Sequence, residues 1–251
     1  MSGHSKWSQI KRQKGVADAK RGQVFTKLAK IVTVAAKRGG GDPAMNPSLR
    51  VAIEQARAEN MPKDNIDRAI KRGTGELGGA VIEELRYEVY GPAGVAIVID
   101  AVTDNPNRTT AEVKATLNKH GGKLATAGAV AFQFRQQGII LLPIAGQKLS
   151  PDDLELMLIE AGAASYETQG DLVSVITEPK DISHVKDELV RQGVVVTEVK
   201  LSFEPIQTVG VTDLGDAKQI LRLVEALEDV EDVTSVTANF DISDELLASS
   251  T

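Results

Sequence analysis

The sequence predicts an α+β protein with three domains, a helical bundle at the N-terminus and two α/β domains, one inserted into the other. Three observations carry this prediction. Apolar residues recur at three- and four-residue spacing up to residue 72, whereas strand-length apolar runs such as "VAIVIDAV" follow the glycine-rich junction "RGTGELGGA". The charge changes there too. Residues 1–75 hold 16 Lys and Arg against 6 Asp and Glu, and residues 76–251 hold 13 against 29. The net charges are +10 and −16, which suggests a polyanion-binding end and an acidic remainder.

Three short amphipathic helices are expected in the basic part. The first runs from Gln23 to Arg38, with two cations in its last turn, and we expect Gly39 to take the left-handed cap position. A second helix is predicted at 48–59, and a third follows Pro62 and ends at Gly73. Together they can close a small bundle with a polar, mostly basic outer face.

The next segment predicts strands and one helix. "LRYEVY" and "VAIVIDAV" read as strands joined by the turn "GPAG". The following helix begins with a capping box, Thr109 with Glu112, and ends at Gly121. "GAVAFQF" then reads as a further strand.

Residues 138–204 follow the order strand, helix, strand, strand, helix, strand, which is the ferredoxin-like split unit. A helix at about 216–227 and the strand "VTSVTANF" remain, and they complete the earlier strands into another four-stranded, two-helix layer. We therefore expect a basic helical domain at 1–78, a discontinuous ferredoxin-like domain at 79–135 plus 207–245, and an inserted ferredoxin-like domain at 136–206.

Catalysis, metals and membranes are not indicated. The chain has no cysteine and three dispersed histidines, and no apolar run is long enough to span a bilayer. It lacks the P-loop, HExxH and GxSxG motifs, and its GxGxxG at 73–78 follows a helix where a dinucleotide site needs a strand. We expect a cytoplasmic protein that is not an enzyme and has no cofactor or small-molecule substrate.

The basic segment offers candidate nucleic-acid contacts. Phosphates can be neutralised by cations of the N-terminal arm and of the first helix: Lys6, Lys11, Arg12, Lys14, Lys20, Arg21, Lys27, Lys30, Lys37 and Arg38. Trp7 can stack on an unpaired base, or it can anchor the arm to the bundle. For the cations the alternative is a solvated helix face.

Two segments of the α/β part are weaker candidates. In "TDNPNRT", Asn105, Asn107 and Arg108 precede a helix and can bind a phosphate there, or they can be turn and cap residues. "GAVAFQF" has a faint likeness to the aromatic strand of RNA-recognition domains, with Phe132 and Phe134 on one face, but core packing is favoured.

Several longer motifs resemble one family. "GHSKW", "DAKRG", "GGGDP", "NMPKDNI", "YE.YGP.G.A" and "TDN.NRT..EV" occur in order and resemble the YebC/PmpR family, which includes mitochondrial translational activators of cytochrome c oxidase. The resemblance begins at Gly3, so the arm is expected in the mature protein. It implies the three domains above and two roles, transcriptional regulators that bind DNA and ribosome-associated factors that assist synthesis of proline-rich stretches.

The expected function is therefore a non-enzymatic regulator of gene expression. Its primary partner is DNA, bound through the basic N-terminal domain and linked to the transcription machinery. The alternative partner is the ribosome, contacted through ribosomal RNA. A second alternative is a protein-interaction scaffold that uses the acidic α/β surfaces.

Overall fold

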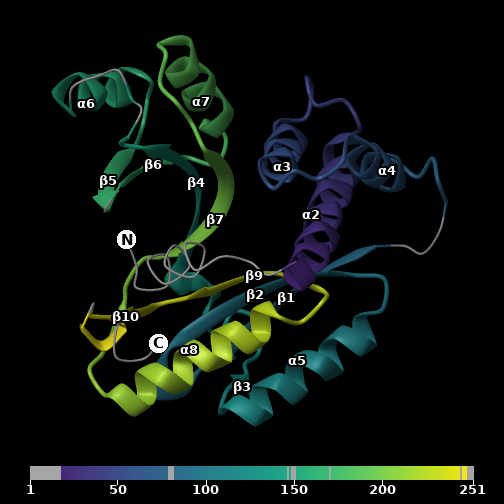
Figure 1. Ribbon diagram of the computed structural model, residues 1–251. Helices are drawn as coiled ribbons and strands as arrows, with labels where there is room; N and C mark the ends of the chain where they lie inside the picture. The colour runs from purple at the N-terminus through teal and green to yellow at the C-terminus, as the bar shows by residue number, and fades with distance from the viewer. Residues whose placement is uncertain are drawn as a thin grey trace. The chain divides into compact units, whose positions relative to one another are not determined.

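The computed structural model describes residues 18–78, 82–145, 147, 151–169, 171–243 and 245–247. The predicted basic arm spans residues 3–19: its residues 3–17, with Trp7, lie outside this part, and residues 18 and 19 belong to the first described helix. In the described chain three helices come first, and strands and helices follow in a mixed order, so the predicted α+β class is confirmed (Figure 1). None of the described helices combines the length and the apolar character that a bilayer crossing requires.

The chain forms two compact units. The first unit contains Met1–Val34, Leu77–Arg135 and Glu204–Thr251, and the second contains Ala35–Glu76 and Gln136–Phe203. One long helix, α2 (Asp18–Gly39), contributes residues to both units. The three predicted domains divide the chain differently, and that division stays a prediction.

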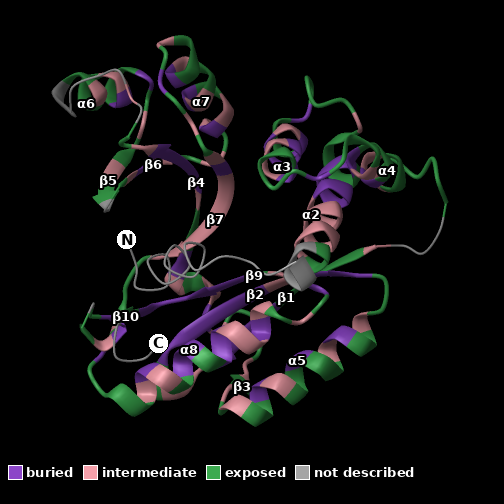
Figure 2. Cartoon of the chain, in the orientation of Figure 1, coloured by how far each residue is buried: buried purple, intermediate pink, exposed green. Residues whose placement is uncertain are grey.

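The first unit is built on an antiparallel sheet with the strand order β3-β1-β2-β9. Its strands are β1 (Glu83–Tyr90), β2 (Ala96–Thr103), β3 (Lys123–Leu124) and β9 (Val233–Ala238). β1 and β2 form the predicted hairpin around a 3-10 turn, η1 (Pro92–Gly94). β2 is buried along almost its whole length, as its continuous apolar run predicts (Figure 2).

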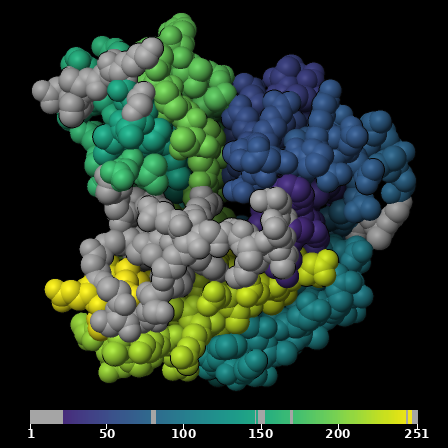
Figure 3. All heavy atoms as spheres, in the orientation of Figure 1, coloured from purple at the N-terminus to yellow at the C-terminus, as the bar shows by residue number. Residues whose placement is uncertain are grey.

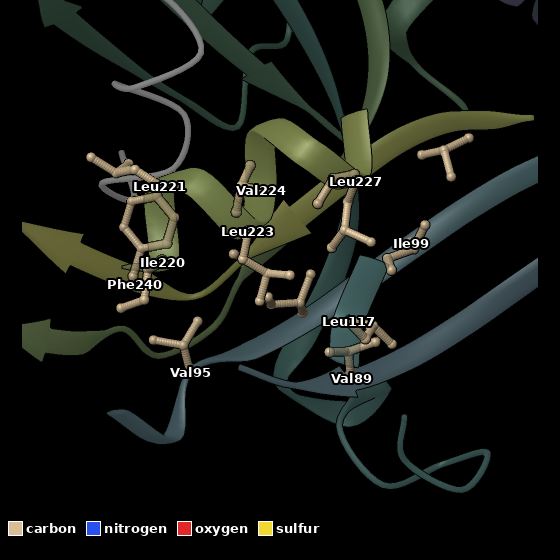
Figure 4. Packing of buried hydrophobic residues seen from close by; sticks show 14 of the residues in the cluster. Val89, Val95, Ile99, Leu117, Ile220, Leu221, Leu223, Val224, Leu227 and Phe240 are labelled. Carbon is tan, nitrogen blue, oxygen red and sulfur yellow. The ribbon is translucent and has the colours of Figure 1, made fainter. Parts of the chain in front are cut away.

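Two helices, α5 (Pro106–His120) and α8 (Leu214–Glu228), cover one face of this sheet (Figure 1). They lie side by side in the space-filling view (Figure 3). Ile99 of β2, Leu117 of α5 and Leu223 of α8 meet in the core between the layers (Figure 4). Burying a side chain of this size contributes about 1.5–3 kcal/mol, so these contacts fix both helices on the sheet.

The third strand of this sheet differs from the prediction. "GAVAFQF" does not form a strand, because the two-residue β3 pairs with β1 in its place. The segment folds as a loop and a 3-10 turn, η2 (Ala131–Gln133), and Phe134 then opens the next strand. The carboxylate of Glu88 accepts hydrogen bonds from the N–H groups of Gly128, Val130 and Ala131. A side chain thus satisfies N–H groups that a strand would satisfy through its neighbour.

A short parallel pair, β8 (Val209–Val211) and β10 (Phe240–Ile242), ends the first unit. The sequence analysis did not predict these two strands as a pair. Phe240 is fully buried and packs into the same core as α8 (Figure 4).

The sheet of the second unit has the order β5-β6-β4-β7. Its elements are β4 (Phe134–Pro143), α6 (Pro151–Glu160), β5 (Ser165–Gln169), β6 (Leu172–Thr177), α7 (Ile182–Arg191) and β7 (Glu198–Pro205). The first and third strands are central, as in the predicted split βαβ unit. The first sheet reaches a similar two-layer arrangement through another connectivity, since its central strands are a hairpin.

The second unit also contains the helices α3 (Pro47–Ala58) and α4 (Lys63–Gly73). The end of α2 differs from the prediction by one residue: Gly39 is helical, and Gly40 has the left-handed conformation with φ 86°. Gly39 is needed for another reason, because a Cβ there would lie 2.6 Å from the Asn46 side chain. Asn46 caps α3 by accepting a hydrogen bond from the Leu49 N–H.

Candidate nucleic-acid interface

The predicted phosphate-binding residues fall into several groups in the structure. Lys6, Trp7, Lys11, Arg12 and Lys14 lie outside the described residues. Lys20 and Arg21 lie in the first turns of α2, and their side chains are outside the described part too. The roles predicted for these seven residues stay predictions. The other cations have defined surroundings, which separate them into an intramolecular set and an exposed set.

Lys27 and Lys30 belong to the intramolecular set. The Lys27 ammonium donates a hydrogen bond to the backbone carbonyl of Glu228, at the end of α8. Lys30 Nζ lies 3.2 Å from the carbonyl oxygen of Glu231 and 2.6 Å from Asp232 Oδ1. The Lys30 side chain is only 17% exposed. Both lysines therefore attach α2 to the turn between α8 and β9.

Asp232 is the centre of a buried polar cluster, and its side chain is 2% exposed. Its Oδ2 accepts hydrogen bonds from Thr103 Oγ1 at 3.0 Å, Thr109 Oγ1 at 2.7 Å and Arg108 Nη2 at 2.8 Å. Together with Lys30 on Oδ1, four side chains from α2, β2 and α5 converge on one carboxylate. We call these five residues the Asp232 cluster.

These contacts keep the Asp232 carboxylate ionised. Burial alone would raise the pKa of Asp232, because it disfavours the carboxylate. The hydrogen bonds from Lys30, Arg108 and Thr109 and the positive charge of Lys30 lower it by more, so the pKa lies well below its ordinary value. Asp232 is therefore ionised throughout the neutral range, and the cluster stabilises the fold.

The "TDNPNRT" segment contains the start of α5, and this helix begins earlier than predicted. Asn105 is the N-cap, with its Oδ1 3.1 Å from the N–H of Arg108, so the predicted capping box of Thr109 and Glu112 is wrong. The Thr109 hydroxyl instead faces Asp232. Arg108 also pairs with Asp104 at 3.1 Å, and Asn107 is exposed. Asn105 has a structural role as the helix cap, and Arg108 has one through its ion pairs. Phosphate binding by these residues stays a prediction.

Lys37 and Arg38 belong to the exposed set. They occupy the last turn of α2, and Lys71 and Arg72 occupy the last turn of α4. Inside the second unit, the loop that follows α2 reaches the end of α4, because Gly41 lies against Ile70 and Thr74. A Cβ at Gly41 would lie 2.9 Å from the Thr74 methyl group.

We call Lys37, Arg38, Lys71 and Arg72 the helix-end cluster. All four side chains are exposed. Cations in the last turn stabilise each helix through its dipole, but four like charges at neighbouring ends also raise the local positive potential. The cluster can therefore attract phosphate groups. The sequence predicted Lys37 and Arg38 as candidates because they end the first helix. That α4 lies close to them depends on tertiary packing, which the sequence does not show.

The loop that contains Phe132 has a further exposed group. Phe132 is 71% exposed and Phe134 is 7% exposed. Core packing, favoured for both on sequence, is therefore right for Phe134 and wrong for Phe132. In the predicted strand, side chains two residues apart share a face, so both rings were expected on one side. The observed η2 is a 3-10 turn, and it leaves Phe132 exposed and Phe134 buried. In the described residues, no group of three or more His, Asp or Glu side chains is placed to hold a metal ion.

Two family models match this chain over most of its length. A family model described as the TACO1/YebC protein N-terminal domain matches residues 5–76. A second model, described as the TACO1/YebC second and third domain, matches residues 82–240. Together the two models cover the basic segment and both α/β sheets.

Full-length relatives carry a common name. A "Probable transcriptional regulatory protein" of Halothermothrix orenii is 46% identical over 98% of both chains. Another with that name, from Dictyoglomus turgidum, is 49% identical over 99% of both chains. The crystal structure of a conserved hypothetical protein from Aquifex aeolicus is similar with a TM-score of 0.83, at 42% identity over 92% of this chain and 94% of that one.

Proposed function

Because the chain belongs to the TACO1/YebC family, we propose that it regulates gene expression by binding nucleic acid, without catalysing a reaction. The membership predicted from the sequence motifs is confirmed. A regulatory role in general is supported by the name that its relatives share. The proposed primary target is DNA, bound in the cytoplasm through the basic N-terminal segment.

The observation that carries this proposal is the helix-end cluster. Lys37, Arg38, Lys71 and Arg72 are exposed, and Gly41, which follows α2, lies against Ile70 and Thr74 at the end of α4. Each phosphate that such a cation neutralises releases a condensed counterion, which favours binding. In the proposal the arm cations and Lys20 and Arg21 supply further phosphate contacts. The net charge of −16 makes residues 76–251 as a whole a weaker partner for phosphates than the basic segment.

The same proposal gives Lys27, Lys30 and Arg108 a supporting role. Their ammonium and guanidinium groups already bind the Asp232 carboxylate or the end of α8. A phosphate would have to compete with a buried carboxylate for Lys30 and Arg108. We therefore give these three residues a structural role in the first unit, where Lys27 and Lys30 attach α2 and Arg108 pairs with Asp232.

A salt titration tests the proposal. Four Gln substitutions, at Lys37, Arg38, Lys71 and Arg72, should weaken binding to a fluorescent 20-base-pair DNA. The slope of log affinity against log salt should become shallower by about 0.9 for each phosphate contact removed. The matched control is Lys114→Gln with Lys119→Gln, which removes exposed cations of α5. Melting temperatures verify that both variants fold.

Two outcomes would contradict this assignment. The first is an affinity that does not depend on salt. The second is an equal loss of affinity in the α5 control. Crosslinking with sequencing of bound DNA and RNA then identifies the target. If mostly ribosomal RNA is recovered and the protein co-sediments with ribosomes, the ribosome and not DNA is the target. Partners that are captured equally well after nuclease treatment would favour the scaffold alternative.

A further inference from the structure

The loop from Ala125 to Phe134 presents one aromatic ring to solvent. Val130 is fully buried and Phe134 almost so, while Phe132 between them is 71% exposed. The exposed ring leaves a large apolar surface in contact with water, which a bound ligand could cover. The surroundings of η2 show whether this ring is held in place.

Three polar groups hold η2. The Glu88 carboxylate, itself buried, accepts hydrogen bonds from Gly128 N at 2.5 Å, Val130 N at 2.6 Å and Ala131 N at 2.8 Å. At the other end, Asn239 Nδ2 donates to Gln133 Oε1 at 3.0 Å, and the Gln133 carbonyl accepts from the Ile206 N–H at 2.8 Å. The backbone on both sides of Phe132 is thus fixed. The ring loses little conformational entropy when it binds a ligand.

A second exposed aromatic side chain belongs to the same loop region. Tyr90, at the end of β1, is 45% exposed, and its hydroxyl donates to the Ala129 carbonyl at 3.5 Å. Among the aromatic side chains that the structure describes, Tyr90 and Phe132 are the exposed ones. In a chain with 4% aromatic residues, two exposed rings bound to one loop indicate a binding surface.

We propose that Phe132, assisted by Tyr90, is a stacking platform for an unpaired base of single-stranded nucleic acid. This inference rests on the proposed function. Every base has a π-face, so a fixed ring binds single strands with little regard to sequence. Two exposed cations accompany the rings: Lys123 is opposite Tyr90 in the sheet, and Arg135 follows Phe132 by three residues. They favour a ligand with phosphates beside the stacked base.

The Phe132 ring is tested by substitution in the full-length chain. Phe132→Ala should weaken binding to fluorescent 12-nucleotide strands about 5- to 100-fold, as expected for the loss of one stacked base. Phe132→Leu should weaken it as well, because leucine keeps apolar bulk but has no π-face. Affinity for a DNA duplex of the same sequence should change less than about twofold, since its bases are already stacked. DNA and RNA strands tested in parallel identify the preferred source.

A control and a direct readout complete the experiment. Leu156→Ala removes an exposed apolar side chain of α6 and should leave every affinity unchanged. Ultraviolet crosslinking of the wild-type complex, followed by mass spectrometry, should locate a nucleotide on residue 132. Equal melting temperatures of the variants exclude unfolding, and an exposed Phe132 contributes few core contacts that its substitution could remove.

The outcomes separate the two proposals. If duplex and single strands bind with salt-dependent affinity but Phe132→Ala has no effect, the stacking inference fails and the proposed function stands. If Phe132→Leu binds the single strands like the wild type, apolar bulk suffices and the stacking inference is overturned. If neither form of nucleic acid binds in a salt-dependent way, the proposed function fails together with this inference.

Discussion

Asp232 connects several elements of the first unit through its carboxylate. Lys30 and Arg108 bring two positive charges to its buried carboxylate, and two threonine hydroxyls complete its coordination. A buried ion pair is a weak source of net stability, because its desolvation opposes its attraction. Its loss is nevertheless costly, since the remaining charges have no counterpart. Lys30 is separated from Asp232 by 202 residues, so the cluster also joins distant parts of the chain.

Asp232→Asn tests this role. The substitution keeps the size of the side chain but removes the charge that Lys30 and Arg108 face. We expect a loss of about 3 kcal/mol in the free energy of unfolding, measured by urea denaturation. The matched control is Asp104→Asn, which removes the exposed partner of Arg108 and should barely change the denaturation midpoint. Similar losses in both variants would show that burial at Asp232 is unimportant.

At the scale of elements, the sequence predicted best where local pattern and tertiary contact agree. The buried strand β2 and the amphipathic helix α8 have strong periodicity and were found at nearly the expected positions. "GAVAFQF" has the alternation of a strand, but Glu88, 40 residues earlier, binds its N–H groups and prevents pairing. Such long-range hydrogen bonds have no local signature. A long-range contact also explains why the predicted capping box is wrong: the Thr109 hydroxyl binds Asp232 and does not cap α5.

The junction of α2 and α3 supplies the prediction at this scale. The Asn46 Oδ1 caps α3, while its Nδ2 donates to the carbonyls of Ala35 at 2.8 Å and Gly40 at 2.9 Å. Asn46→Ala should lower the free energy of unfolding by about 2–3 kcal/mol, because it removes the cap and leaves these carbonyls without a donor. Thermal and urea denaturation measure the loss.

Two further substitutions make this prediction specific. Asn46→Asp retains the acceptor that caps α3 but places a negative charge beside two carbonyl oxygens, so it should be no better than Asn46→Ala. Asn107→Ala changes an exposed asparagine at a comparable helix start and should have little effect. A fully stable Asn46→Asp protein would mean that only the cap matters.

For the whole molecule, charge was the most informative property of the sequence. The division into a basic segment of +10 and an acidic remainder of −16 indicated where phosphate contacts should lie. It did not reveal which cations are already engaged, because Lys27 and Lys30 find their partners only after the chain folds. Residue type therefore predicted the candidate set, while the exposed helix-end cluster became evident only from packing.

Acid should destabilise the first unit before the second. The first unit contains Asp232 and Glu88. Burial raises the pKa of each, but the hydrogen bonds that each accepts lower it by more, so both lie below their ordinary values. A carboxyl group with a lowered pKa in the folded state contributes stability that is complete above its unfolded value, about 4. This contribution decreases as the pH falls below that value. In the second unit, the pKa of Glu188 is lowered by an Arg191 that is largely exposed, so solvent screens the effect.

Pepsin digestion between pH 4 and pH 2, with fragments mapped by mass spectrometry, measures this order. The earliest cuts should fall in β1, β2 and α5 of the first unit, because protonation of Glu88 and Asp232 weakens the loop and the cluster that support them. Asp232→Asn lacks one of the two titrating groups, so its melting temperature should fall less between pH 6 and pH 3 than that of the wild type. Early cuts confined to β5, β6 and α7 would mean that other carboxyl groups control acid stability.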